Sequence, residues 1–442
     1  MRTYTLTSAR AFRFRLGTAA IMAAVLPLSG CEDDFLEYTD PDIITDANSA
    51  SGAIALRNGV VQRFTQMVNG MQGPDALFIY SGLVADEWRS GDTFEQRNQA
   101  DIRSIPEENT FLDDVLLRLN QVRTQGRSAI NSLRQFVPTP TSNVGLMFAL
   151  TGFVENLAGE AYCNGIPFSE LADDGTPVFA DPVTVDSAFR RAVASADSAL
   201  KYVTGTDGPK VADLARIVKG RALLNLNQPA DAAAAVTTVA TSFEYQVFHS
   251  SITTTNQTWA LNAGARRYVV ADNEGGNGLP FVSAADPRVV TATPTPLSFD
   301  SQTPFVALTN FGQFDPMTVA GGIEARLIEA EAALRAGDAA GWLAKLNEAR
   351  ATRTDLPALA DPGSEAARVD LTFYERAFWM FATGHRLGDL RRLVRQYGRG
   401  AETVFPTGAF HKGGSYGSDL NIPISFDERN NPNFTGCLDR NP

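Results

Sequence analysis

Two consecutive segments in the last third of the chain have the pattern of an antiparallel helical hairpin. Residues 322–334 and 339–353 carry apolar residues at helical spacing, and Gly337-Asp338 separates them. Alanines recur at the positions where the two segments would face each other, so the helices can approach closely. A chain with this element is expected to be mainly α-helical and to bury its helices in pairs.

Helical spacing extends over most of the chain. Residues 211–241 repeat the hairpin layout, with Asn227-Gln228-Pro229 between the halves. A helical pair of about 34 residues is the unit of tetratricopeptide-type repeats. We therefore expect a tetratricopeptide-like scaffold, with helix pairs within 47–241 and 321–397. Further segments with apolar residues at helical spacing cover 47–70, 111–136, 143–162, 185–203 and 371–397.

Three segments interrupt the helical pattern, namely 72–110, 243–315 and 400–442. They are rich in Gly, Pro, Thr, Asn and aromatic residues, which predicts long loops with short strands such as residues 267–270. Loops this long in a compact protein usually carry function. We expect residues 31–442 to form a single domain, a helical-repeat scaffold with an irregular face.

The N-terminus has the build of a lipoprotein signal peptide covering residues 1–30. Four arginines and no acid precede the apolar run 16–28, which ends in Leu28-Ser29-Gly30-Cys31. We expect cleavage before Cys31, diacylation of its thiol, and a lipid anchor instead of a spanning helix. The acidic triplet 32–34 is either a solvated tether or a signal for the outer face of the outer membrane. An ordinary signal peptide with a chance cysteine is the alternative.

The charge balance excludes nucleic acid as a partner. Without residues 1–30, 34 Lys and Arg face 50 Asp and Glu, a formal net charge of −16. Phosphates require a basic surface.

The two remaining cysteines, Cys163 and Cys437, are expected to pair. They are the only thiols besides Cys31, and disulfides persist outside the cytoplasm. The alternative is two buried free thiols.

Motifs for catalysis or metal binding are weak. Gly413-Gly414-Ser415-Tyr416-Gly417 fits a nucleophile elbow literally, but all three histidines lie upstream of the serine and glycines surround it. His385 and Asp389 are four residues apart, and we interpret them as structural ion pairs rather than an active site. No metal site is predicted, although carboxylates could bind a structural calcium ion.

The densest run of charged residues resembles the C-terminal signature of the SusD/RagB family. Glu375-Arg376 is followed by Gly384-His385-Arg386 and by Asp389-Leu390-Arg391-Arg392. Other pieces follow in the family's order across the whole mature chain. These are residues 31–36, 160–170, Asp286-Pro287-Arg288, 330–350, and 421–424 with 430–433.

The resemblance implies a nutrient-binding lipoprotein on the outer membrane. Such proteins capture oligosaccharides, or peptides in the RagB branch, and act as a lid on a SusC-like TonB-dependent barrel. The implied fold is a set of tetratricopeptide-like helix pairs that supports a loop-rich ligand-binding half. No catalytic activity and no cofactor other than the lipid on Cys31 are implied. A tetratricopeptide-type scaffold lipoprotein of an envelope assembly complex is the alternative function, and a surface hydrolase has no surviving motif.

Two loop segments have the aromatic and polar mixture that binds sugars. Either glycan or peptide fits this mixture, and core packing is the alternative for each aromatic. We single out Trp88 first. The first segment, within 78–103, contains Tyr80, Asp86, Trp88, Arg89, Asp92, Phe94 and Arg97, and the second contains Trp259, Asn262, Arg266, Arg267 and Tyr268.

Overall fold

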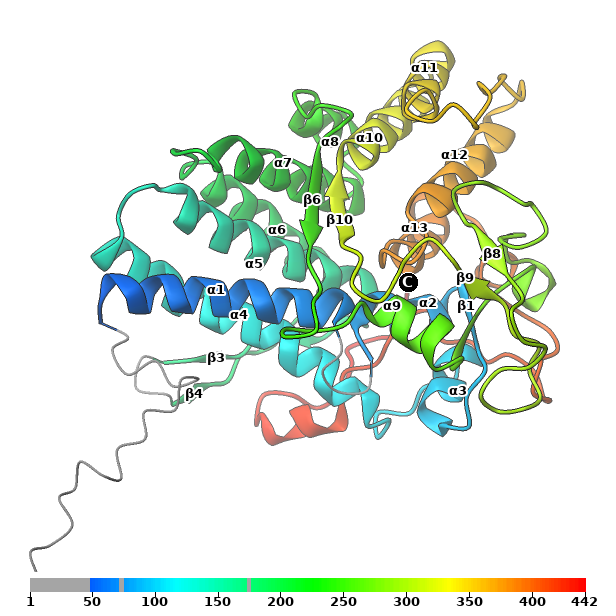
Figure 1. Cartoon of the computed structure of the whole chain (residues 1–442), viewed down its shortest axis with the longest axis horizontal. Coiled ribbons are helices and arrows are strands. Elements are labelled where there is room, and N and C mark those ends of the chain that lie inside the picture. Colours follow the sequence, from blue (N-terminus) through cyan, green and yellow to red (C-terminus); the bar gives the residue numbers. More distant parts are fainter. Residues whose placement is uncertain (1–47, 71–74, 173–175) are drawn as a thin grey trace, which may run out of the picture. The chain divides into compact units, whose positions relative to one another are not determined.

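The computed structural model describes residues 48–70, 75–172 and 176–442 (Figure 1). The predicted signal peptide, Cys31 and the acidic triplet 32–34 lie outside the described residues. Within the described ranges, none of the helices combines the length and apolar character needed to cross a membrane.

Paired helices form the first part of the molecule, here called the helical part. Each helix packs against the next along the chain from α4 to α8, and α1 packs on α4 and α10 on α8 (Figure 1). Side chains of Thr184, Asp338 and Ser364 cap the N-termini of α6, α11 and α12. The helices are α1 (Ala50–Asn69), α4 (Phe111–Phe136), α5 (Ser142–Ala161), α6 (Val185–Ala199), α7 (Gly208–Asn225), α8 (Pro229–Val236), α10 (Gly322–Arg335), α11 (Ala339–Arg350) and α12 (Glu365–Trp379).

Glycines on α5 allow the close approach of α6. Gly145, Gly152 and Gly159 are seven residues apart and lie on one face of the helix. A Cβ on Gly145 would lie 2.1 Å from the carbonyl oxygen of Tyr202, and one on Gly159 would lie 2.5 Å from the Phe189 ring. The two helices therefore pack at a distance that any larger side chain would prevent.

The rest of the chain, here called the loop-rich part, comprises residues 75–110, 243–316 and 400–442. Short antiparallel strand pairs organise it or join it to the helical part. The pairs are β1 (Trp88–Ser90) with β7 (Tyr268–Val270), β8 (Thr291–Ala292) with β9 (Ala307–Leu308), and β6 (Glu244–Val247) with β10 (Met317–Gly321). Two further pairs lie after α5, namely β2 (Ile166–Pro167) with β5 (Pro182–Val183), and β3 (Glu170–Leu171) with β4 (Pro177–Val178).

Two sequence expectations about these elements are wrong. The single helix predicted over 371–397 is two helices, α12 and α13 (Arg386–Tyr397), because Ala382 and Gly384 between them have positive φ. The segment 72–110 is not only loop, since it contains α2 (Leu77–Val84) and α3 (Glu95–Asp101). All of α2 is buried, so its continuous apolar run hides the helical period.

Shorter helical segments complete the loop-rich part. Residues 257–264 continue from α9 (Gln257–Trp259) into a wider π-helical turn, Ala260–Gly264. The other segments are η3 (Glu274–Gly276), α14 (Ala401–Val404) and η4 (Phe426–Asn430).

Helix α13 joins the two parts, because it packs against α5 of the helical part and α2 of the loop-rich part. Asp389 accepts hydrogen bonds from Arg376 and Arg392, each at 2.8 Å. Nε2 of His385 lies 3.1 Å from Glu324 rather than pairing with Asp389. The structural interpretation of His385 and Asp389 is therefore correct.

A disulfide between Cys163 and Cys437 is present, as the sequence predicts. Cys163 follows the end of α5, and its backbone N–H donates to the carbonyl of Ile422. The bond therefore fastens the C-terminal tail to the helical part.

Candidate ligand-binding site

The two loop segments predicted to hold the ligand lie side by side in the structure. β1 belongs to the first segment and β7 to the second, and they pair with Trp88 opposite Val270 and Ser90 opposite Tyr268. Segments 170 or more residues apart in sequence thus lie side by side in the loop-rich part.

Most of the individual residues expected to contact the ligand are nevertheless buried. A ligand cannot stack on a side chain that has no exposed face, so these expectations are wrong and core packing is the correct interpretation. The buried candidates are Tyr80, Asp86, Trp88, Asp92, Arg97, Asn262 and Tyr268.

Packing and charge pairing account for their burial. The Trp88 ring lies 5.3 Å from Phe381 and contacts Tyr268 edge-on. Asp86 binds Arg386 of α13 through two hydrogen bonds, at 2.5 and 2.8 Å. Charged residues of this kind can enter a core when each has a partner, which a single sequence does not reveal.

Arg89 and Trp259 stay partly exposed, and so do Phe94, Arg266 and Arg267 of the same two segments. Arg89 keeps 26% of its side chain accessible, and its guanidinium contacts Glu274 at 2.6 Å. Trp259 ends α9. Neither Arg89 nor Trp259 lies in an arrangement that by itself indicates a binding surface.

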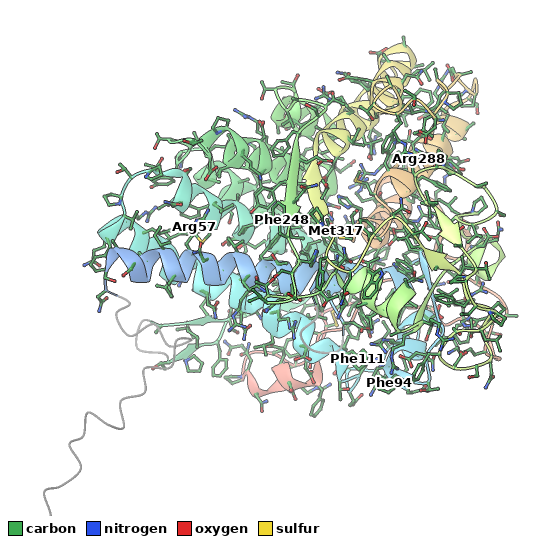
Figure 2. All side chains as sticks on the ribbon, viewed as in Figure 1. Arg57, Phe94, Phe111, Phe248, Arg288 and Met317 are labelled. Carbon is green, nitrogen blue, oxygen red and sulfur yellow. A yellow bond between two sulfur atoms is a disulfide. The ribbon has the colours of Figure 1, made fainter. Side chains whose placement is uncertain are left out.

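An exposed aromatic platform, defined here as Phe94, Arg267 and Phe299, lies beside these buried residues. Phe94 is 46% exposed and Phe299 is 41% exposed. The Arg267 guanidinium lies 4.9 Å from the centre of the Phe94 ring and 3.8 Å from that of Phe299, within cation–π distance of both. Figure 2 shows Phe94 beside Phe111, which it contacts edge-on.

Buried contacts hold the platform in place. Asp92 accepts a hydrogen bond from Arg267 at 2.6 Å and also pairs with Arg97. Burial acts to raise the pKa of Asp92, but the hydrogen bonds and charges of these two arginines outweigh it and lower the pKa. The backbone N–H groups of Phe299 and Asp300 donate to the carbonyls of Arg266 and Gly91. The platform is thus pre-organised rather than formed by mobile side chains.

Sequence reasoning named Phe94 and Arg267 within larger sets but missed Phe299. Phe299 lies in the predicted loop 243–315, where nothing in its neighbours distinguishes it from other aromatic residues.

A cavity of about 550 Å³ lies between the β6–β10 pair, the end of α12 and the break before α13. Arg288 lies at the wall of the cavity and forms ion pairs with Asp286 and Glu375. Figure 2 labels two of the lining residues, Arg288 and Met317. The walls are mostly apolar, and the aromatic lining residues are Phe243, Phe311, Phe378, Trp379 and Phe381.

The buried pair Glu324 and His385 borders the same cavity. Burial acts to raise the pKa of Glu324, but the charge and hydrogen bond of His385, with Arg221 and Arg376, outweigh it and lower the pKa. Ser415 of the Gly-rich motif is exposed, in a loop where it bridges to Ala409. The segment therefore lacks the strand-to-helix turn of a nucleophile elbow.

Comparison with known proteins identifies the architecture. No family model and no curated protein matches the chain. A SusD superfamily protein from Parabacteroides distasonis superposes with a TM-score of 0.68 over 88% of this chain and 98% of that one, at 12% identity. The chain has the SusD-like fold.

Two further solved structures agree with this SusD-like assignment. A surface glycan-binding protein A from Bacteroides uniformis gives a TM-score of 0.63 at 15% identity, covering 88% of this chain and 99% of that one. A SusD-like carbohydrate binding protein from Bacteroides vulgatus gives 0.58 at 13% identity, covering 78% and 83%. The expected fold, a mainly α scaffold with a loop-rich part, is confirmed.

Proposed function

We propose that this protein is a non-catalytic binding protein that captures an oligosaccharide on the aromatic platform. The observation that carries the proposal is the Arg267 guanidinium held within cation–π distance of two exposed phenylalanine rings. The C–H face of a pyranose stacks on an aromatic ring, while a guanidinium donates hydrogen bonds to hydroxyl groups. The carbohydrate-binding and glycan-binding proteins that share this fold support an oligosaccharide over a peptide.

The second part of the proposal is delivery to a transporter. Cys31 would carry the lipid anchor at the outer membrane, facing the exterior, and a SusC-like TonB-dependent barrel would receive the ligand. The signal sequence and the fold support this role. A scaffold of an envelope assembly complex would need neither a ligand platform nor a barrel partner.

Calorimetric titration with a panel of oligosaccharides and peptides tests the binding site, and the chain offers matched controls. Phe299→Ala and Phe94→Ala should weaken binding of the captured oligosaccharide by roughly tenfold or more, which is about 1.4 kcal/mol or above. Phe314→Ala and Phe426→Ala should leave affinity unchanged, because these rings are 41% and 47% exposed but lie outside the platform. Phe426 is also stacked by an arginine, Arg429, at 5.3 Å.

The outcomes separate the alternatives. Equal loss in platform and control variants would contradict the platform as the site. If the protein binds peptides but not sugars, and the platform variants lose this binding, the ligand is a peptide and not an oligosaccharide. If Trp379→Ala in the cavity abolishes binding while Phe299→Ala does not, the cavity is the site.

Isolation of the full chain from membranes tests delivery. A stoichiometric complex with a TonB-dependent barrel is expected for the wild type, and the Cys31→Ala variant should leave the membrane fraction. Co-purification with an assembly machine instead of a barrel would overturn the delivery role.

A further inference from the structure

Three side chains with metal-binding atoms meet in the loop-rich part, at a place that the ligand platform does not use. We call Asp101, Glu274 and His411 the His–carboxylate cluster. Each offers one ligand atom, and the three atoms lie within 4.8 Å of one another. Nδ1 of His411 is 3.8 Å from Oδ2 of Asp101 and 3.9 Å from Oε1 of Glu274. The residues come from the end of α3, from η3 and from the loop after α14.

The backbone of Ser90 orients two of the three ligands. Its N–H donates to Oδ2 of Asp101 at 2.7 Å, and its carbonyl lies 3.0 Å from Nε2 of His411. A carbonyl can only accept, so Nε2 carries the proton. In the neutral imidazole the lone pair is then on Nδ1, which faces both carboxylates.

The cluster also has unmet hydrogen-bonding capacity. Among the residues that the structure describes, neither Nδ1 of His411 nor Oδ1 of Asp101 has a hydrogen-bond partner, although both atoms are buried and Asp101 is only 1% exposed. Buried polar atoms without a partner are rare and call for an explanation such as an ion.

Electrostatics place a neutral imidazole beside two crowded carboxylates. Burial, with the charges of Arg89 and Lys412, lowers the pKa of His411 to about 4, so its imidazole is neutral. Burial and the nearby Glu274 carboxylate raise the pKa of Asp101. A cation between the two carboxylates would relieve this repulsion and displace the proton.

We propose that the His–carboxylate cluster binds one divalent first-row transition-metal ion, with Zn²⁺ as the best match. One imidazole nitrogen and two carboxylates are ligands that suit Zn²⁺, whereas Ca²⁺ takes six to eight oxygen ligands. Outer contacts hold Glu274, because Arg89 binds its Oε2 at 2.6 Å and the Tyr416 hydroxyl donates to its Oε1. The ion would tie three distant segments together next to the Ser90 strand.

Metal titration of the full chain, purified without a histidine tag and stripped with a chelator, tests the proposal. We expect one zinc per chain by elemental analysis and a rise in thermal midpoint with added zinc. The conservative variants Asp101→Asn and His411→Gln should weaken zinc binding by roughly 10- to 100-fold or more, because even outer-shell contacts are worth that much. His249→Gln is the matched control, since His249 is also buried but lies outside the cluster and hydrogen-bonds two carbonyls.

Each outcome decides the proposal. Loss of zinc in the two cluster variants, with an unchanged circular dichroism spectrum and with zinc retained by His249→Gln, supports it. Zinc content below one equivalent in the wild type, or equal binding in all variants, overturns it. Binding of calcium in preference to zinc by the same residues also overturns it. None of these readouts depends on the oligosaccharide, so the result is separate from the proposed function.

Discussion

The helical part and the loop-rich part are held together by different physical means. Helices α5 and α6 meet over glycine faces, so that their stability comes from close packing of nonpolar surface. The loop-rich part has short helices and short strand pairs, and the buried ion pair of Asp86 with Arg386 connects it to α13. Close packing is disturbed by an added atom, whereas a buried ion pair fails when either partner is removed.

We therefore expect that removing one charge on α13 lowers the free energy of unfolding more than replacing a glycine on α5 by alanine does. Asp389→Ala removes the carboxylate that Arg376 and Arg392 share, and it leaves two buried guanidinium groups short of a partner. We expect a loss of about 3–5 kcal/mol in the free energy of unfolding, measured by urea denaturation. Asp370→Ala is the control, because Asp370 is exposed and its partner Arg399 is only partly buried. A loss below about 1 kcal/mol for Asp389→Ala would show that the packing of α13 on α12 does not depend on this network.

The disulfide is the second connection between the parts. Replacing both Cys163 and Cys437 by alanine should cost roughly 2–5 kcal/mol, because the closed loop of more than 270 residues no longer restricts the unfolded chain. Proteolysis should then release the C-terminal tail before the helices are cut. Cleavage that starts in the helical part would contradict the assignment of the bond to the tail.

Glu87 makes the contact between the loop-rich part and the start of α13 pH-dependent. Its Oε1 accepts from the backbone N–H of Ala382, in the break before α13, and burial raises its pKa to about 8. Between pH 4.5 and 8 the unfolded chain releases a proton that the folded chain keeps, so stability falls as pH rises. Glu87→Gln keeps the acceptor and removes the titration. We expect it to be more stable than the wild type near pH 8, by about 4 kcal/mol, with no gain near pH 4.

Glu95→Gln, at an exposed position, is the control. Its free energy of unfolding should match that of the wild type at every pH, because surface substitutions usually change stability by less than about 0.5 kcal/mol. A parallel pH dependence for the wild type and Glu87→Gln would assign the effect to another group.

The same contrast explains how far the sequence could predict the structure. In the helical part the local pattern and the packing agree, so the bounds expected for α4 match the structure. In the loop-rich part the sequence identified the region but not the exposed residues. Trp88 and Phe94 both lie in a stretch of mixed aromatic and charged residues. Trp88 is nevertheless buried, whereas Phe94 is 46% exposed. Strand pairing between β1 and β7 makes this difference, and it depends on contacts that are distant in sequence.

The smallest expected effects come from two glycines of the helical part. Gly159→Ala on α5 would place a Cβ 2.5 Å from the Phe189 ring, and we expect a loss of about 1–3 kcal/mol. Gly59→Ala on α1 should instead stabilise the protein by about 0.5–1 kcal/mol, because within the described ranges its Cβ would meet no atom closer than 4 Å and alanine favours the helix. Thermal unfolding of the two variants measures both changes. If Gly159→Ala lowers stability and Gly59→Ala raises it, glycine is required by the α5–α6 contact and not by helical-repeat folding in general. If both variants change stability in the same direction, close packing at the glycines does not stabilise the α5–α6 contact.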